Sequence, residues 1–145
     1  MKIVLQRVSR ASVTVDGNMV GSIDKGYVVL LGIGSGDNRA KVEKAVDKIQ
    51  KLRIFPDENG KTNLSIADVN GGILVISKFT LYADCRKGNR PSFTDAADPT
   101  LAEDLYNYFI ECSKDKFNKV EHGVFGADMK VELINDGPFT VILED

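Results

Sequence analysis

The chain has 145 residues, the size of one ordinary domain, and no linker or low-complexity tract divides it. Residues 1–145 are therefore expected to form a single domain. Hydrophobic residues make up 43% of the chain and charged residues 28%, proportions that exclude a disordered protein and allow a real core. The formal net charge of -2 argues against a protein that coats duplex nucleic acid, although it permits a local contact with an RNA end.

Cysteine usage and hydropathy indicate a cytoplasmic protein. Cys85 and Cys112 could form at most one internal disulfide, whereas small secreted domains usually carry several. The apolar start at residues 3–5 is interrupted by Gln6 and Arg7, so it is too short for the core of a signal peptide. No segment approaches the roughly 20 apolar residues that a membrane helix requires, and we expect no membrane association.

Several short segments carry the patterns of β-strands. Val13 and Val15 alternate with polar residues and are followed by a turn sequence at residues 16–18, which predicts a β-hairpin. Three further apolar runs have the length of buried strands: residues 27–33, residues 73–77 with a continuation through residues 79–81, and residues 139–143.

Two segments carry helical periodicity. The first runs from about Asn38 to Leu52, with Asp37 or Asn38 able to cap it, and the second begins at Asp98 and Pro99. The residues expected on the two buried faces are Val42, Ala45, Val46, Ile49 and Leu52 in the first helix, and Leu101, Leu105, Tyr108, Phe109 and Cys112 in the second. Short strands with only two helices favour an α+β arrangement over a repeated βαβ one.

Two glycine-containing segments resemble phosphate-binding loops, but each lacks a required residue. In the segment that starts at Gly32, Asp37 occupies the position of the last glycine in a dinucleotide-binding fingerprint. The sequence Gly60-Lys61-Thr62 resembles the end of a P-loop, yet Phe55 stands where the first glycine should be. We interpret both segments as ordinary turns.

His122 is the only histidine, so any serine or cysteine relay would have to depend on it. The chain also lacks the CxxC and HxxxH spacings that are typical of zinc sites. We interpret His122 as a surface or loop residue, and we expect neither a metal nor another cofactor. Catalysis must then come mainly from something other than a side-chain relay.

Two segments resemble the signature motifs of the D-aminoacyl-tRNA deacylase family. Residues 77–81, Ser-Lys-Phe-Thr-Leu, are similar to the Ser-Gln-Phe-Thr motif, with Lys78 where the family usually has glutamine. Residues 135–140, Asn-Asp-Gly-Pro-Phe-Thr, are similar to Asn-x-Gly-Pro-x-Thr. Three further segments match in the same order along the chain: residues 6–8, residues 87–93 and residues 125–129.

The resemblance implies a homodimer built on a barrel-like, mainly antiparallel β-sheet with two main helices. It implies hydrolysis of the ester that joins a D-amino acid to the 3′ acceptor end of tRNA, and activity on glycyl-tRNA mischarged on tRNA-Ala. Ser77, Phe79 and Thr80 would form the catalytic pocket at the subunit interface, where backbone N–H groups near Phe79 and Thr80 would hold the oxyanion. The 2′-hydroxyl of the substrate would assist the reaction; Thr80 as a nucleophile is the alternative, although the sequence supplies no base to activate it.

The same resemblance assigns chiral selection to Gly137 and Pro138, which would be joined by a cis peptide bond and inserted into the pocket of the partner subunit. Arg7 would hold this dipeptide through its backbone. The other residues expected to contact substrate are Lys78, Phe125 and Met129. Lys78, Arg86, Lys87 and Arg90 are candidate neighbours of tRNA phosphates, while a solvated charged face explains Arg86 and Lys87 equally well. Two other functions stay open: a non-catalytic binder of the tRNA acceptor end and a hydrolase of small esters.

Overall fold

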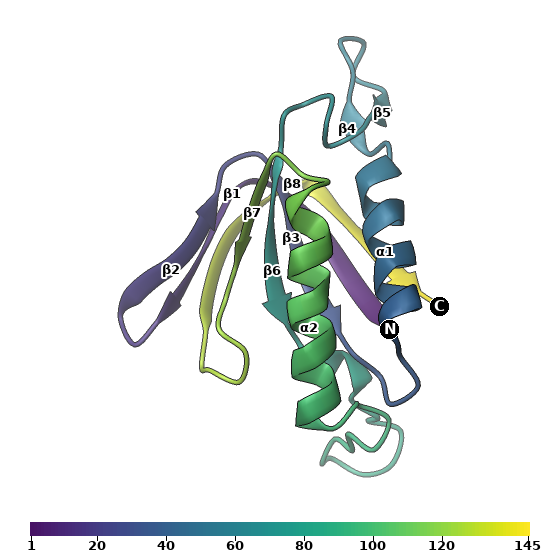
Figure 1. Cartoon of the computed structure of the whole chain (residues 1–145). Coiled ribbons are helices and arrows are strands. Elements are labelled where there is room, and N and C mark those ends of the chain that lie inside the picture. Colours follow the sequence, from purple (N-terminus) through teal and green to yellow (C-terminus); the bar gives the residue numbers. More distant parts are fainter.

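Strand β1 (Lys2–Val15) organises the sheet in the computed structural model, which describes residues 1–145 (Figure 1). Along one edge, β1 pairs antiparallel with β3 (Gly26–Gly32) and then with β2 (Asn18–Ile23). Along its other edge it pairs with β8 (Lys130–Glu144), also antiparallel. Beyond β3 the sheet continues through β6 and β7, so its order is β2-β1-β3-β6-β7 with β8 joined to β1.

The sheet is mixed, because β3, β6 (Gly72–Ser77) and β7 (Lys119–His122) run parallel to one another. Helix α1 (Arg39–Lys51) lies in the connection from β3 to β6, and α2 (Pro99–Lys114) in the connection from β6 to β7. Parallel neighbours need such crossovers, whereas antiparallel ones can be joined by tight turns. The mainly antiparallel sheet that we expected is thus present around β1, as part of a mixed sheet. The expectation that βαβ units are not repeated is wrong, because two such crossovers follow one another through α1 and α2.

A glycine brings the two ends of the sheet together. A Cβ at Gly21 in β2 would lie 2.9 Å from the carbonyl oxygen of His122 in β7, so any larger residue would push the strands apart. Next to it, the backbone N–H of Ser22 donates to a carboxylate oxygen of Glu121 at 3.4 Å. These contacts bend the sheet into a nearly closed barrel, as the resemblance implied.

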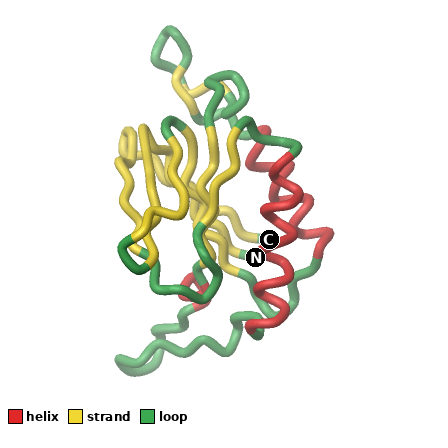
Figure 2. Tube along the Cα trace, turned by 60° about the vertical axis from the view of Figure 1, so that its left-hand side comes forward, coloured by secondary structure: helices red, strands yellow, loops and turns green.

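Both helices cover the same face of the sheet (Figures 1 and 2). The Asn38 side chain accepts a hydrogen bond from the N–H of Lys41 at the start of α1. Of the two predicted candidates, Asn38 is therefore the N-cap and Asp37 is not. Its buried residues are Val42, Val46 and Ile49, on the face that the periodicity predicted. A small hairpin of β4 (Phe55–Pro56) and β5 (Thr62–Leu64) follows it. No helix is long and apolar enough to span a membrane.

Helix α2 begins as expected at Asp98, whose carboxylate accepts a bond from the N–H of Leu101, but its buried face is rotated from the predicted one. Tyr106 is buried and Tyr108, which we expected inside, is only half-buried. The buried residues of this helix are Leu105, Tyr106, Phe109, Ile110 and Ser113. The Tyr108 hydroxyl instead bonds Glu43 of α1, so this side chain joins the two helices at their outer edge.

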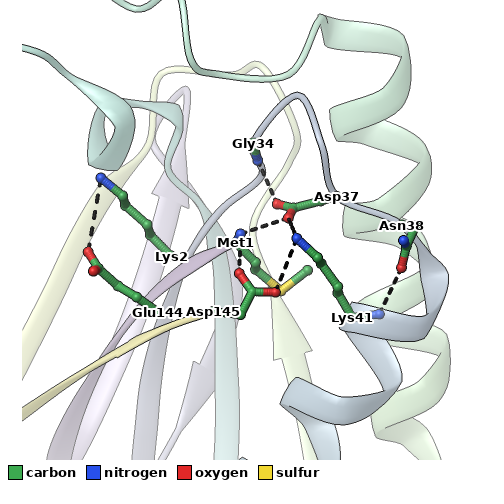
Figure 3. Close-up of polar contacts among 8 residues, drawn as sticks. All are labelled: Met1, Lys2, Gly34, Asp37, Asn38, Lys41, Glu144 and Asp145. Atoms are coloured by element: carbon green, nitrogen blue, oxygen red, sulfur yellow. Dashed lines mark hydrogen bonds and ion pairs between the residues drawn. The ribbon is translucent and has the colours of Figure 1, made fainter.

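Met1 is held by a charge cluster in which the Met1 ammonium and Asp37 are buried and the side chains of Lys41 and Asp145 are half-buried (Figure 3). The Met1 ammonium lies 2.7 Å from the Asp37 carboxylate and 2.8 Å from that of Asp145. Asp37 also accepts a 2.7 Å bond from the backbone N–H of Gly34, and the Lys41 ammonium lies 3.4 Å away. The cluster joins the start of β1, the turn before α1 and the end of β8, three segments that are distant in sequence.

Candidate active site

A pocket of about 820 Å³ opens where β3 and β6 end, next to the first turns of α2. The carboxyl ends of adjacent parallel strands lie at one edge of a sheet, and crevices of α/β sheets commonly form there. Ile76 and Ser77 from β6 and Leu31 from β3 form one wall. Ala102 and Tyr106 of α2 line it from the helical layer, and most of the lining is hydrophobic.

The segment after β6 turns into the pocket wall instead of continuing as a strand. The N–H of Lys78 donates to Leu31 at 2.8 Å, and residues Phe79–Tyr82 then form the short 3-10 helix η1. The strand expected through residues 79–81 is therefore wrong. The first hydrogen bond of η1 runs from the N–H of Leu81 to the carbonyl oxygen of Lys78, at 3.2 Å. The N–H groups of Phe79 and Thr80 precede it and therefore have no carbonyl partner within this helix.

Six of the nine residues singled out from the sequence line this pocket. They are Ser77, Lys78, Phe79, Thr80, Phe125 and Met129. They arrive from two segments that are nearly fifty residues apart, one at the end of β6 and one in the loop before β8. Hydroxyl, ammonium and aromatic groups thus face a common apolar space, which is the usual character of a small-molecule site.

Two aromatic residues of the pocket, Phe93 and Tyr106, were not predicted as site residues from the sequence. Phe93 meets Phe79 edge to face, with ring centroids 5.0 Å apart, and both rings are exposed at the mouth. Tyr106 lies deeper, and its hydroxyl is 3.3 Å from the carbonyl oxygens of Val75 and Gly123. Burial raises the pKa of Tyr106 to about 12, so it stays a neutral hydrogen-bond donor. A predicted buried face of α2 shifted by one residue along the helix would have included Tyr106.

The remaining three residues, Arg7, Gly137 and Pro138, lie together away from the pocket of the same chain. The Gly137–Pro138 peptide bond is cis, as the resemblance implied, and both residues are exposed. They project from β8 where its pairing with β1 shifts register between Gln6 and Arg10. Neither residue lines the pocket described above.

The spacing of the second motif has a structural cause in the bulge at residues 135–140 of β8, which we call the Gly-Pro turn. The Asn135 side chain accepts a 2.6 Å bond from the N–H of Phe139 and donates a 3.0 Å bond to the hydroxyl of Thr140. These two bonds join the strand residues before and after Gly137 and Pro138. Asparagine at the start of the motif and threonine at its end thereby close the turn that presents the dipeptide.

Arg7 supports the turn from β1. Its side chain is mostly buried, its Nε donates to the carbonyl of Asp136 at 3.0 Å, and its Nη1 donates to the carbonyl of Ile54 at 2.6 Å. The guanidinium also stacks on the Phe139 ring, with Cζ 4.6 Å from the centroid. Arg7 therefore bonds the backbone beside Gly137, in the manner that the resemblance implied.

His122 lies at the end of β7, outside the residues that line the pocket. Its Nδ1 is 2.7 Å from the carbonyl oxygen of Gly123, and its ring is perpendicular to that of Tyr106, with centroids 6.5 Å apart. Cys85 and Cys112 are both free thiols. No three histidine, cysteine or carboxylate side chains are grouped as metal ligands.

Fold and site together define a small α+β barrel with an apolar pocket at the ends of its parallel strands and an exposed Gly-Pro turn on its longest strand pair. The chain belongs to the family of D-Tyr-tRNA(Tyr) deacylases, whose model matches residues 4–144. It is 55% identical over 144 residues to a D-aminoacyl-tRNA deacylase of Dictyoglomus turgidum, a match that covers 99% of this chain and 92% of the relative. A D-aminoacyl-tRNA deacylase of Lactobacillus acidophilus is 54% identical, with 99% of both chains covered.

Two solved structures have the same fold. One is a c-Myc DNA Unwinding Element Binding Protein, 44% identical with a TM-score of 0.94, covering 100% of this chain and 99% of that one. The other is a probable eukaryotic D-amino acid tRNA deacylase, with a TM-score of 0.87 over 98% of this chain and 97% of that one. Since its sequence identity is only 16%, this second likeness concerns the fold alone.

Proposed function

We propose that this protein is an enzyme that hydrolyses the ester bond of D-aminoacyl-tRNA and releases free D-amino acid and tRNA. The observation that carries the proposal is the pocket in which the first signature motif, residues 77–80, meets a second matching segment, residues 125–129. In this proposal the enzyme works in the cytoplasm without a cofactor, and the 3′ acceptor end of the tRNA enters the pocket. Ser77, Phe79 and Thr80 surround the ester.

Catalysis in this proposal depends on backbone donors and on the substrate. The carbonyl carbon of an aminoacyl ester is already activated, so the enzyme has to position water and stabilise the negative charge that develops on the carbonyl oxygen. The N–H groups of Phe79 and Thr80 are suited to this role because they have no partner within η1. The 2′-hydroxyl of the terminal adenosine assists the attack, which explains how hydrolysis proceeds without a histidine in the pocket lining.

Chiral selection in this proposal is supplied by a second subunit. Gly137 and Pro138 are exposed on β8 and absent from the lining of their own pocket, so a filter made by them has to enter the pocket of another copy. The rigid backbone would exclude an L side chain while leaving a D side chain pointing outward. Glycine has no side chain to exclude, so glycyl-tRNA mischarged on tRNA-Ala is also a substrate.

The homodimer is tested by its mass. Sedimentation equilibrium should give about twice the chain mass of 15.9 kDa. An active monomer would contradict a filter supplied by the partner and would leave the chiral selection to the pocket itself.

The reaction is tested by incubating the protein with matched D- and L-aminoacyl-tRNA and measuring the ester that remains. Rapid loss of the D-ester alone is the expected result. Binding of both charged tRNAs without release of amino acid would favour a non-catalytic binder of the acceptor end. Equal hydrolysis of simple D- and L-amino acid esters that carry no nucleotide would favour a hydrolase of small esters.

A further inference from the structure

The chain that follows η1 forms a fixed loop at the mouth of the pocket. Asp84 and Ser92 exchange two backbone hydrogen bonds of 2.7 and 2.9 Å, which close the loop between them. Beyond Ser92, Phe93 packs against Phe79 of the pocket rim. In Figure 1 the loop is the teal-green excursion beside the first turn of α2. Because both ends are tied to the pocket wall, the backbone of the loop is held beside the mouth of the pocket.

This part of the chain has a charge opposite to that of the rest. Residues 78–92 contain four basic side chains and one acidic side chain, a net charge of +3, whereas the whole chain has -2 and the remaining residues together carry -5. Positive charge is thus concentrated in this one segment beside the pocket, whereas the acidic residues near the pocket, Asp95, Asp98 and Asp128, lie on other segments. A local excess of this kind attracts a polyanion to one place on the surface and keeps it away from the others.

The basic side chains of the loop are not equivalent. Arg86 makes a two-point bond to the Asp84 carboxylate, with distances of 2.9 and 2.8 Å, so its charge is already neutralised. Lys87 and Arg90 are exposed and have no carboxylate within ion-pair distance. Lys78 is also exposed, but it lines the pocket itself. Lys87 and Arg90 are therefore the free cations of the loop.

We propose that the loop of residues 84–92 binds the sugar-phosphate backbone of the tRNA 3′ strand next to the terminal adenosine, with Lys87 and Arg90 contacting phosphates. The inference rests on the proposed function, which requires a nucleotide chain to leave the pocket at its mouth. Each nucleotide of that chain adds one negative charge. Contacts with phosphates increase affinity without reading sequence, and their strength falls as salt rises. The pocket then selects the amino acid, and the loop selects a substrate that carries RNA.

The double variant Lys87→Glu/Arg90→Glu tests this inference against the matched double variant Lys25→Glu/Lys61→Glu. Lys25, between β2 and β3, and Lys61, between β4 and β5, are exposed lysines without ion pairs, and neither lines the pocket. The change of net charge is identical in the two double variants. Two substrates with the same D-amino acid are compared: full-length D-aminoacyl-tRNA and D-aminoacyl-adenosine, which has no phosphate. Binding of uncharged tRNA by fluorescence anisotropy is measured in parallel over a range of salt concentrations.

The loop variant should raise KM for D-aminoacyl-tRNA roughly tenfold near physiological salt and reduce the slope of log affinity against log salt by about 1.4, as expected for two lost phosphate contacts on a single strand. Its kinetics on D-aminoacyl-adenosine should equal those of the unmodified protein, which also shows that the variant is folded. The control variant should change KM for tRNA by less than twofold. Equal losses in the two double variants, or a loss on D-aminoacyl-adenosine as large as on tRNA, would overturn the inference. If the unmodified protein released no amino acid, the proposed function would fail, and the anisotropy comparison would still decide whether the loop binds tRNA.

Discussion

The guanidinium of Arg7 links two backbone segments that are more than eighty residues apart, because it donates to the carbonyl of Asp136 at 3.0 Å and to that of Ile54 at 2.6 Å. One planar side chain thus holds the turn of Gly137 and Pro138 against the segment that follows α1. Lysine could not make the same contacts, since a guanidinium presents several donors in a fixed fork and an ammonium is a single point charge. The dipeptide therefore depends on a residue from the opposite end of the sequence.

Replacing Arg7 should lower both the stability of the fold and the rate of D-aminoacyl-tRNA hydrolysis. Arg7→Ala leaves two carbonyl groups without their donor, and we expect the free energy of unfolding to fall by about 2–3 kcal/mol. Hydrolysis of D-aminoacyl-tRNA should decrease at temperatures where the variant remains folded. Calorimetry and the deacylation assay measure the two effects. Arg10→Ala is the matched control, because Arg10 lies on the same strand but is exposed and forms no ion pair. Similar losses in both variants would show that the Arg7 contacts are not responsible.

Gly137→Ala should disturb the turn directly. The backbone of Gly137 has φ of +137°, a region that side chains rarely adopt, and an added Cβ would lie 3.1 Å from both Arg7 Nη2 and the N of Phe139. We expect a loss of about 1–2 kcal/mol in stability from the strained backbone. The added methyl should also reduce the rate on D-aminoacyl-tRNA, as followed by single-turnover kinetics. Gly36→Ala, at a glycine with open space around it, should leave both quantities unchanged.

The roles of the substrate and of Thr80 can be separated with two changes. A tRNA that carries the D-amino acid on the 3′ position and hydrogen in place of the terminal 2′-hydroxyl should react much more slowly and bind nearly as well. Thr80→Val keeps the backbone N–H and the shape of the side chain, so it should retain most of the rate on normal substrate. The opposite pattern, with a normal rate on the deoxy substrate and none in Thr80→Val, would make Thr80 the nucleophile.

His122→Ala should retain nearly full activity, because this side chain is outside the pocket lining and its Nδ1 faces the carbonyl of Gly123. A chelator should likewise leave the rate unchanged, since no cluster of metal ligands lies near the pocket. Steady-state rates with and without chelator provide the measurement. If both treatments abolished hydrolysis, a metal bound through His122 would have to be part of the reaction.

Asp37→Asn should lower the stability of the fold while leaving the pocket intact. Asp37 is buried and pairs with the Met1 ammonium at 2.7 Å, and after its neutralisation only the Asp145 carboxylate, at 2.8 Å, still compensates this charge. Losing one charged hydrogen bond of the ammonium should cost about 1.5–3 kcal/mol. Chemical denaturation should reveal the loss, and Asp24→Asn, at an exposed turn residue, should show none. Equal midpoints for the two variants would mean that the cluster contributes nothing to stability.

Local chemistry was sufficient to predict several features from the sequence. The two helices begin at or beside the expected caps, and the hairpin forms at residues 16–18 as its turn residues indicated. The two motifs identified the residues of the pocket wall and of the Gly-Pro turn. Each of these features depends on residues within a few positions of one another, so it can be predicted from the sequence.

Three features were decided only by tertiary contacts. The parallel arrangement of β3, β6 and β7 results from helices that cross over the sheet, and no single strand pattern reveals which neighbour it will have. The segment at residues 79–81 has the composition of a strand, yet it turns into η1 after the N–H of Lys78 bonds Leu31 of a different strand. Tyr106 is inside and Tyr108 at the edge because α2 packs at once on the sheet and on α1. In each case the more stable conformation is determined by contacts with residues that are distant in sequence. Local sequence patterns carry no information about these contacts.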